Sequence, residues 1–334
     1  MPELRFNPAL KEWVIIAKER SKRPEDFQAG TYQIGSDIID NCPFCPGHEH
    51  LTPPEVLSYR EAGTPANKPG WWIRIIPNKY YALSPEGQPT RNKAGEIFMS
   101  MNGVGRHEVI VESPQHDQTI TTMGRKQAEE IFLAYRDRYT ELTKDPRFEM
   151  IILFKNYGFN AGTSLLHPHS QIIATPVAPR HIRDRIEIAM MHFDEQGSCL
   201  YCDIIKAEKE AGVRVVLETG RFIVIEPFAS RSPFETWIIP KAHDSNFEEI
   251  SVESCKELAE VVQRILGKIS KILSNPDYNY VILSAPAHER GLEYYHWHLK
   301  IIPRISATAG FEIGSGMFIN PVIPEEAARY LREA

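Results

Sequence analysis

Eight residues of this chain have the types and the spacing of zinc ligands. The sequence contains two Cys-x-x-Cys pairs, and each pair is followed by a lone histidine and then by a His-x-His sequence. Tetrahedral structural zinc takes four Cys or His ligands, and one Cys-x-x-Cys turn can deliver two thiolates to the same ion. The sequence therefore predicts two zinc ions per chain, one held by Cys42, Cys45, His116 and His167 and the other by Cys199, Cys202, His243 and His296.

A Cys-x-x-Cys pair can also be a redox dithiol or simply two ordinary thiols. A thioredoxin-type pair stands at the start of a helix that follows a strand, and neither CPFCPG (42–47) nor CLYC (199–202) clearly offers that context. The same arrangement of histidines after both pairs favours zinc. The fifth cysteine, Cys255, lies inside a helical pattern and is expected to be a plain buried or half-buried thiol.

The second histidine of the first His-x-His sequence, His169, is a candidate nucleophile. Alternate residues of a strand share a face, so His169 would be fixed one step beyond the zinc ligand His167, with one ring nitrogen free. An imidazole can attack phosphorus and carry the phosphoryl group covalently. Gln171 could donate an amide hydrogen to that group, and the small residues of NYGFNAGTS (156–164) would let backbone N–H groups approach phosphate.

The second His-x-His sequence lacks this context. Its counterpart of the glutamine is Lys300, and no comparable glycine loop precedes it. We therefore expect one catalytic centre, built by the first half of the chain, and we expect His298 to be a packing or surface histidine.

The elements that must position these residues occur twice. Each half contains, in order, a Cys-x-x-Cys pair, β-like runs, a long amphipathic run and a strand that leads to His-x-His. The amphipathic runs, 125–144 and 252–273, have apolar residues at helical spacing. The repeat predicts an α+β fold of two duplicated units, each an antiparallel sheet crossed by one long helix. The units are expected to cover residues 1–180 and 190–334, with a boundary near 178–198.

The composition excludes several classes of protein. The 334 residues are 42% hydrophobic and 25% charged, which is typical of a globular protein and not of a disordered one. A net charge of −6 disfavours a general nucleic-acid-binding surface. The apolar runs are far shorter than the ~18 residues that cross a bilayer, and no secretory signal is visible. We expect a cytoplasmic protein that binds neither nucleic acid nor membranes.

Several segments resemble the galactose-1-phosphate uridylyltransferase family, a branch of the histidine-triad superfamily. The resemblance covers nearly the whole chain and is carried by NYGFNAGTSLLHPHSQ (156–171), RFNPALKEWVIIAKERSKRP (5–24) and CPFCPG. The second zinc quartet and the ending GFEIGSGMFINPVIPEE (310–326) are similar to the plant ADP-glucose phosphorylases within that family. The resemblance implies two histidine-triad-like halves, with the active site in the first.

The resemblance also implies a ping-pong nucleotidyl transfer. His169 would take the nucleoside monophosphate from a nucleotide sugar and release the sugar 1-phosphate, and a second sugar 1-phosphate or phosphate would then attack the nucleotidyl-histidine. Gln171 would hold the transferred phosphoryl oxygens. The other implied contacts are Gly162 and Ser164 with phosphate, Phe44, Asn78 and Asn156 around the nucleoside, and Arg20 and Arg23 from the partner subunit of a homodimer.

Departures from the family pattern affect the choice of substrate. Lys79 stands where the galactose enzyme commonly has an Asp, and the Glu and Gln that contact the hexose in that enzyme have no clear counterpart near the C-terminus. The leading prediction is uridylyl transfer from UDP-glucose to a hexose 1-phosphate such as galactose 1-phosphate. One alternative is an ADP-glucose phosphorylase, which passes adenylyl to phosphate. An alternative of another class is a non-catalytic, zinc-bearing nucleotide-binding protein.

Overall fold

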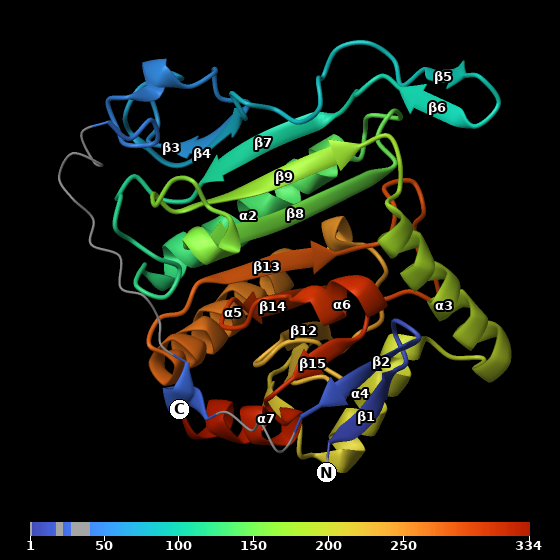
Figure 1. Ribbon diagram of the computed structural model, residues 1–334. Coiled ribbons are helices and arrows are strands. Elements are labelled where there is room, and N and C mark those ends of the chain that lie inside the picture. Colours follow the sequence, from blue (N-terminus) through green and yellow to red (C-terminus); the bar gives the residue numbers. More distant parts are fainter. Residues whose placement is uncertain (1, 18–22, 28–40) are drawn as a thin grey trace.

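The centre of the molecule is a ten-stranded sheet. The computed structural model describes residues 2–17, 23–27 and 41–334 (Figure 1). The sheet has the order β10-β11-β12-β14-β13-β8-β9-β7-β4-β3, and every neighbouring pair is antiparallel. Its strands are β3 (Leu57–Arg60), β4 (Trp71–Pro77), β7 (Arg106–Val111), β8 (Met150–Tyr157), β9 (His169–Thr175), β10 (Val215–Glu218), β11 (Phe222–Ile225), β12 (Thr236–Pro240), β13 (Tyr278–Leu283) and β14 (His298–Pro303).

The two halves of the chain contribute matching sets of five strands. Outward from the middle, the first half runs β8-β9-β7-β4-β3 and the second runs β13-β14-β12-β11-β10. This confirms the predicted α+β fold. The two expected sheets are joined at β8 and β13, where Asn156 pairs with Asn279 and Tyr157 with Tyr278. The join gives each of these strands a second partner and leaves neither as an exposed edge.

One long helix from each half covers the same face of the sheet. Helix α2 (Arg125–Leu142) packs against α5 (Val252–Leu273), and both lie behind the sheet in Figure 1. These helices confirm the two amphipathic runs. On α5, Leu258, Ile265 and Ile269 are at most 1% exposed, as expected for the buried stripe of an amphipathic helix. The Ser251 side chain accepts a hydrogen bond from the Ser254 N–H and caps α5.

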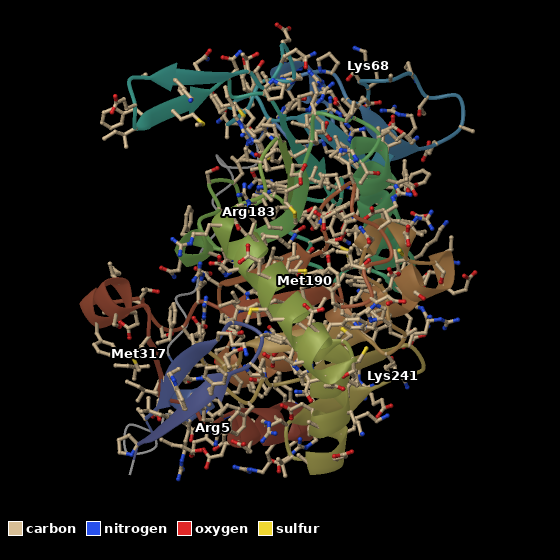
Figure 2. All side chains as sticks on the ribbon, turned by 90° about the vertical axis from the view of Figure 1, so that its right-hand side faces the viewer. Arg5, Lys68, Arg183, Met190, Lys241 and Met317 are labelled. Carbon is tan, nitrogen blue, oxygen red and sulfur yellow. The ribbon has the colours of Figure 1, made fainter. Side chains whose placement is uncertain are left out.

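The segment between the expected units is helical. Helices α3 (Arg180–Gln196) and α4 (Leu200–Ala211) connect the halves, and Figure 2 shows α3 on the side of the molecule with Arg183 and Met190 labelled. A three-stranded sheet, β1 (Glu3–Asn7), β2 (Glu12–Ile16) and β15 (Phe318–Asn320), pairs the N-terminal strands with a strand close to the C-terminus. The N-terminal residues therefore pack on the second half of the chain.

The remaining elements are short. They are the hairpin β5 (Arg91–Ala94) and β6 (Phe98–Met101), helices α6 (Gly310–Ser315) and α7 (Pro324–Glu333), and the 3-10 turns η2 (Pro24–Asp26), η3 (Glu49–Leu51), η4 (Phe159–Ala161) and η5 (Phe247–Glu249). The hairpin projects beyond the end of the large sheet in Figure 1. Among the described residues, none of the helices combines the length and the apolar character needed to span a membrane.

Candidate active site

The first predicted zinc quartet comes together in the structure. The ligand atoms of Cys42, Cys45, His116 and His167 all lie within 4.8 Å of one another. Cys45 Sγ is 3.4 Å from His116 Nδ1 and 3.6 Å from His167 Nδ1. His167 Nε2 lies 2.7 Å from the Ser113 carbonyl oxygen and donates to it, which leaves Nδ1 free of a proton and directed at the metal position. Burial lowers the pKa of His167 to about 4, so the ring stays in its neutral, ligating form.

The second quartet comes together in the same way. The ligand atoms of Cys199, Cys202, His243 and His296 meet the same 4.8 Å limit, and Cys202 Sγ is 3.6 Å from both histidine Nδ1 atoms. Cys199 directly precedes α4 as its N-cap residue, so the expectation that neither pair clearly begins a helix is wrong for this pair. The preceding element is α3 and not a strand, and histidines face the sulfur atoms. The donor set of each quartet therefore fits tetrahedral zinc.

His169 begins β9 beside the first quartet and is held in one orientation. Its Nδ1 lies 2.8 Å from the His167 main-chain oxygen and donates to it, which leaves Nε2 with a free lone pair. The Phe44 ring packs on the His169 ring with centroids 5.4 Å apart. Burial lowers the pKa of His169, so the ring is neutral and can act as a nucleophile. The side chain is 7% exposed.

Its counterpart in the second half has a different environment. His298 is fully buried, and its ring packs against Tyr201 and Trp237 with centroids 4.9 and 5.0 Å away. It is a packing histidine in this structure, as the sequence suggested.

Two cavities meet at His169. The larger, of about 430 Å³, brings together Phe44, Asn78, Ser164, His169 and Gln171, and its apolar wall contains Leu51, Ile76 and Val109. The smaller, of about 190 Å³, contains Asn156, Thr163, His167 and His169. An apolar wall with a few amides suits a nucleoside base. His169 lines both cavities.

The glycine loop shapes the smaller cavity. Gly158 and Gly162 both have positive φ, +84° and +87°, on either side of η4. Gly162 lines neither cavity, and an added Cβ there would come 3.9 Å from Asn156 Nδ2. Gly162 therefore lies beside Asn156, which is itself a predicted contact residue. A glycine at this position permits the positive φ of the turn.

Of the two predicted arginines, Arg23 lies within the described residues. Arg23 has a 73% exposed side chain whose ion-pair partner is Glu25 at 3.9 Å. Arg20 lies outside the described residues.

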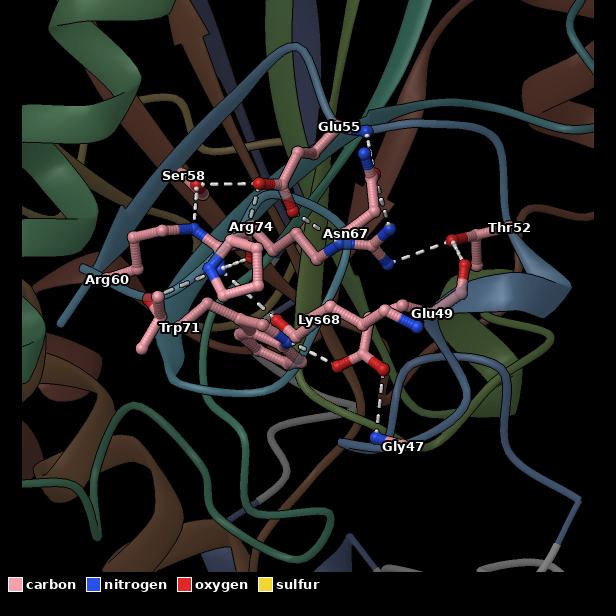
Figure 3. Close-up of polar contacts among 12 residues, drawn as sticks. Gly47, Glu49, Thr52, Glu55, Ser58, Arg60, Asn67, Lys68, Trp71 and Arg74 are labelled. Carbon is pink, nitrogen blue, oxygen red and sulfur yellow. Dashed lines mark hydrogen bonds and ion pairs between the residues drawn. The ribbon is translucent and has the colours of Figure 1, made fainter. Parts of the chain in front are cut away.

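A polar network fixes the loop that carries Phe44 and the first cysteine pair (Figure 3). Glu49 accepts hydrogen bonds from Trp71 Nε1 at 2.8 Å and from the Gly47 N–H at 3.0 Å. Nearby, Glu55 accepts from Arg60 at 2.6 Å and from Arg74 at 3.0 Å, which lowers the pKa of this carboxyl. Sequence reasoning missed these residues, because single charged residues in a loop carry no motif.

The sequence reasoning also missed a buried ion pair behind His169. Lys155 on β8 pairs with Glu112, and Lys155 Nζ donates to the His169 main-chain oxygen at 3.2 Å. Both side chains are at most 2% exposed. A lysine within an apolar strand is a signal that could have found the pair, since a buried ammonium needs an opposite charge.

Comparison with known proteins identifies the family. The models of the N-terminal and C-terminal domains of galactose-1-phosphate uridyl transferase match residues 1–179 and 185–333. The chain belongs to the galactose-1-phosphate uridylyltransferase family. As a member of this family it is an enzyme of the nucleotidyltransferase class, as the sequence predicted.

Two relatives with different named activities are similar to this chain over more than nine tenths of their length. The ADP-glucose phosphorylase of Arabidopsis thaliana is 37% identical over 336 residues, which are 99% of this chain and 93% of that protein. The galactose-1-phosphate uridylyltransferase of Thermotoga maritima is 32% identical over 341 residues, 100% of this chain and 98% of that protein. A crystal structure of the Arabidopsis phosphorylase with bound ADP-glucose has a TM-score of 0.84 at 36% identity and covers 100% of this chain and 99% of that one.

Proposed function

We propose that this enzyme transfers a nucleoside monophosphate from a nucleotide sugar to a second phosphate-bearing acceptor through a nucleotidyl intermediate on His169. The observation that carries the proposal is the hydrogen bond from His169 Nδ1 to the His167 carbonyl, which leaves Nε2 free in a residue that lines both cavities. The larger cavity would take the nucleoside. The relatives named above support this class of substrate.

The reaction divides into two displacements at the α-phosphorus. In the first, Nε2 attacks the phosphorus, an N–P bond forms, and the P–O bond to the sugar 1-phosphate breaks, so that this phosphate leaves. In the second, a phosphate oxygen of the acceptor attacks the same phosphorus, the N–P bond breaks, and the imidazole is regenerated. Gln171, on the same cavity wall as His169, would donate an amide hydrogen to the phosphoryl oxygens.

The leading substrate pair is UDP-glucose with a hexose 1-phosphate such as galactose 1-phosphate. ADP-glucose with inorganic phosphate is the second candidate, and the phosphorylase with 37% identity and a TM-score of 0.84 favours it. Both reactions use the same His169 chemistry and differ in the base and the acceptor.

Zinc would have a structural role in this mechanism. Each quartet supplies four protein ligands, and closed sites of that kind stabilise a fold. A metal on His167 would fix the strand start that presents His169.

We further propose two zinc ions per chain and the functional division into 1–180 and 190–334. We also propose a cytoplasmic location and a homodimer in which Arg20 and Arg23 of one subunit contribute to the site of the other.

Trapping of labelled nucleotide tests the reaction class and the base together. The protein is incubated with UDP-glucose or with ADP-glucose, each labelled at the α-phosphorus, and protein-bound label is counted after denaturation. The wild type is expected to retain label that acid releases, while His169→Asn retains none and keeps its thermal midpoint. His288→Asn, a change at an exposed histidine, is the matched control and should label normally. Absence of label on the wild type with both sugars would contradict the mechanism.

A further inference from the structure

His107 lies between the two amide side chains of the larger cavity. It is on β7, between β4 and β9, and in the β7 to β9 register Val109 pairs with Gln171 and His107 with Ile173. His107 is therefore the diagonal neighbour of Gln171 on one face of the sheet. Its Nε2 lies 2.8 Å from Gln171 Oε1 and 3.1 Å from Asn78 Nδ2. One imidazole thus contacts both the predicted phosphate-binding amide and the predicted nucleoside-binding amide.

A main-chain contact decides which ring nitrogen carries the proton. The Ala82 N–H lies 3.2 Å from His107 Nδ1, and a main-chain amide can only donate, so Nδ1 accepts and has no proton. In a neutral imidazole the proton is then on Nε2. The Nε2–H donates to Gln171 Oε1, and the planar amide of Gln171 is left with its NH₂ group directed away from His107.

A main-chain contact also determines the orientation of the Asn78 amide. The Tyr80 N–H donates to Asn78 Oδ1 at 2.8 Å, so the NH₂ group of Asn78 is the part that approaches His107. A protonated Nε2 cannot accept from it. The amide hydrogens of Asn78 therefore remain available to a ligand in the cavity.

We propose that His107 is a positioning residue that holds the Gln171 side chain with its NH₂ group toward the transferred phosphoryl group. The inference rests on the proposed function, because it assigns an orientation to the phosphate contact of that reaction. Without such a partner, the amide of a glutamine can turn by 180° and present its oxygen to the phosphate. The partial negative charge of that oxygen is repelled by the phosphate oxygens. Donors that are oriented before the reaction stabilise the charge that develops in it.

Substitutions that remove or restore the donor test the role. His107→Phe keeps an aromatic ring but has no N–H, and we expect the rate of nucleotidyl transfer to His169 to fall about tenfold or more. His107→Gln has an amide N–H that can donate to Gln171 Oε1, and it should recover most of the rate. The affinity for the nucleotide sugar should change much less than the rate. An unchanged rate in His107→Phe would overturn the proposal.

A double-substitution cycle separates positioning from a general structural effect. In a Gln171→Met background there is no amide to orient, so adding His107→Phe should slow the reaction no further. Losses that multiply would show that His107 acts independently of Gln171 and would overturn the proposal. Failure of the wild type itself to take up label would instead contradict the proposed function.

The tautomer of His107 can be measured in the wild type. Nitrogen NMR of protein labelled with ¹⁵N-histidine distinguishes the two neutral tautomers, and the His107 signals are assigned by their loss in His107→Gln. We expect the proton on Nε2. A proton on Nδ1 would overturn the proposal.

Discussion

Lys155 Nζ donates to the main-chain oxygen of His169 while pairing with the carboxylate of Glu112, and so supports the start of β9 from behind. Tyr135 on α2 donates to Glu112 Oε1 at 2.6 Å, and the Tyr280 hydroxyl of β13 lies 2.6 Å from that of Tyr135. Because Tyr135 gives its proton to Glu112, Tyr280 is the donor in the second contact. A chain of polar contacts therefore connects the proposed nucleophile to the second half of the protein.

Removal of one partner of this ion pair should destabilise the protein strongly. Lys155→Met leaves Glu112, which is fully buried, without its counter-charge. We expect the free energy of unfolding to fall by about 3–5 kcal/mol, because an unpaired buried charge keeps its desolvation cost. Urea denaturation of the zinc-loaded protein measures the change.

Two further variants test the cause of that loss. Lys126→Met is the matched control, because the Lys126 side chain is 86% exposed and lies 4.0 Å from its partner Glu130. We expect its free energy of unfolding to change by no more than about 0.5 kcal/mol. Glu112→Gln combined with Lys155→Met removes both charges and should recover part of the lost stability. A Lys155→Met protein as stable as the wild type would contradict the role of the pair.

Gly158 should tolerate no side chain. Its backbone has φ +84° and ψ 160°, a region that is essentially restricted to glycine. An added Cβ would also lie 1.8 Å from Asp277 Oδ1, and Asp277 Oδ2 accepts from the Asn160 N–H in the glycine loop. We expect Gly158→Ala to lower the free energy of unfolding by several kcal/mol, of which backbone strain contributes about 1–3 kcal/mol. We also expect it to slow nucleotidyl transfer.

The matched control for this change is Gly212→Ala. Gly212 also has a positive φ, +68°, but nothing lies within 4 Å of an added Cβ. It should lose only the backbone contribution of about 1–3 kcal/mol and retain its rate of transfer. Equal losses in the two variants would show that contact with Asp277 is unimportant.

The zinc content should depend on the quartets and not on the remaining cysteine. Cys199→Ser removes one ligand of the second quartet, and elemental analysis is expected to show about one zinc per chain in place of about two. Cys255→Ser, a change at a fully buried thiol outside both quartets, should leave the zinc content unchanged. Two zinc ions in Cys199→Ser, or a loss in Cys255→Ser, would contradict the assignment of ligands.

Both quartets and helix α5 could be predicted because each obeys a local rule. Metal ligation requires particular residue types, so Cys199, Cys202 and the histidines that follow them are visible as a repeated motif. The 3.6-residue spacing of apolar residues predicted a helix from Val252 to Leu273, and α5 covers these residues. Strand alternation placed His169 and Gln171 on one face before the structure was known.

Other features depend on pairings that no local pattern contains. The contact of His107 with Gln171 follows from the register of β7 and β9, and the Asn156 to Asn279 pair follows from the join of β8 with β13. The segment 178–198, expected only as a boundary between the halves, contains helix α3. Long-range register and the choice of sheet partner are set by the packing of the whole core.

The stability of the protein should depend on pH through Glu248. Glu248, in η5, is 7% exposed, and burial raises the pKa of its carboxyl from 4.5 to about 7. The positive charge of Arg290 lowers this pKa, whereas the negative charges of Glu249 and Asp244 raise it further. The folded protein therefore binds more protons than the unfolded chain between about pH 4.5 and pH 7. By linkage, the free energy of unfolding decreases as the pH rises through this window.

Glu248→Gln removes this titration and keeps a side chain of similar shape. Each unit of pKa corresponds to about 1.4 kcal/mol, so we expect the variant to gain about 1–3 kcal/mol relative to the wild type at pH 8 and to differ little at pH 5. Urea denaturation at both values measures the difference, and Glu195→Gln, at an exposed position of α3, should show no such dependence. An equal effect of Glu248→Gln at pH 5 and pH 8 would show that Glu248 has no raised pKa. A gain confined to pH 8 would mean that the wild type carries a buried carboxylate whose ionisation opposes folding under neutral conditions.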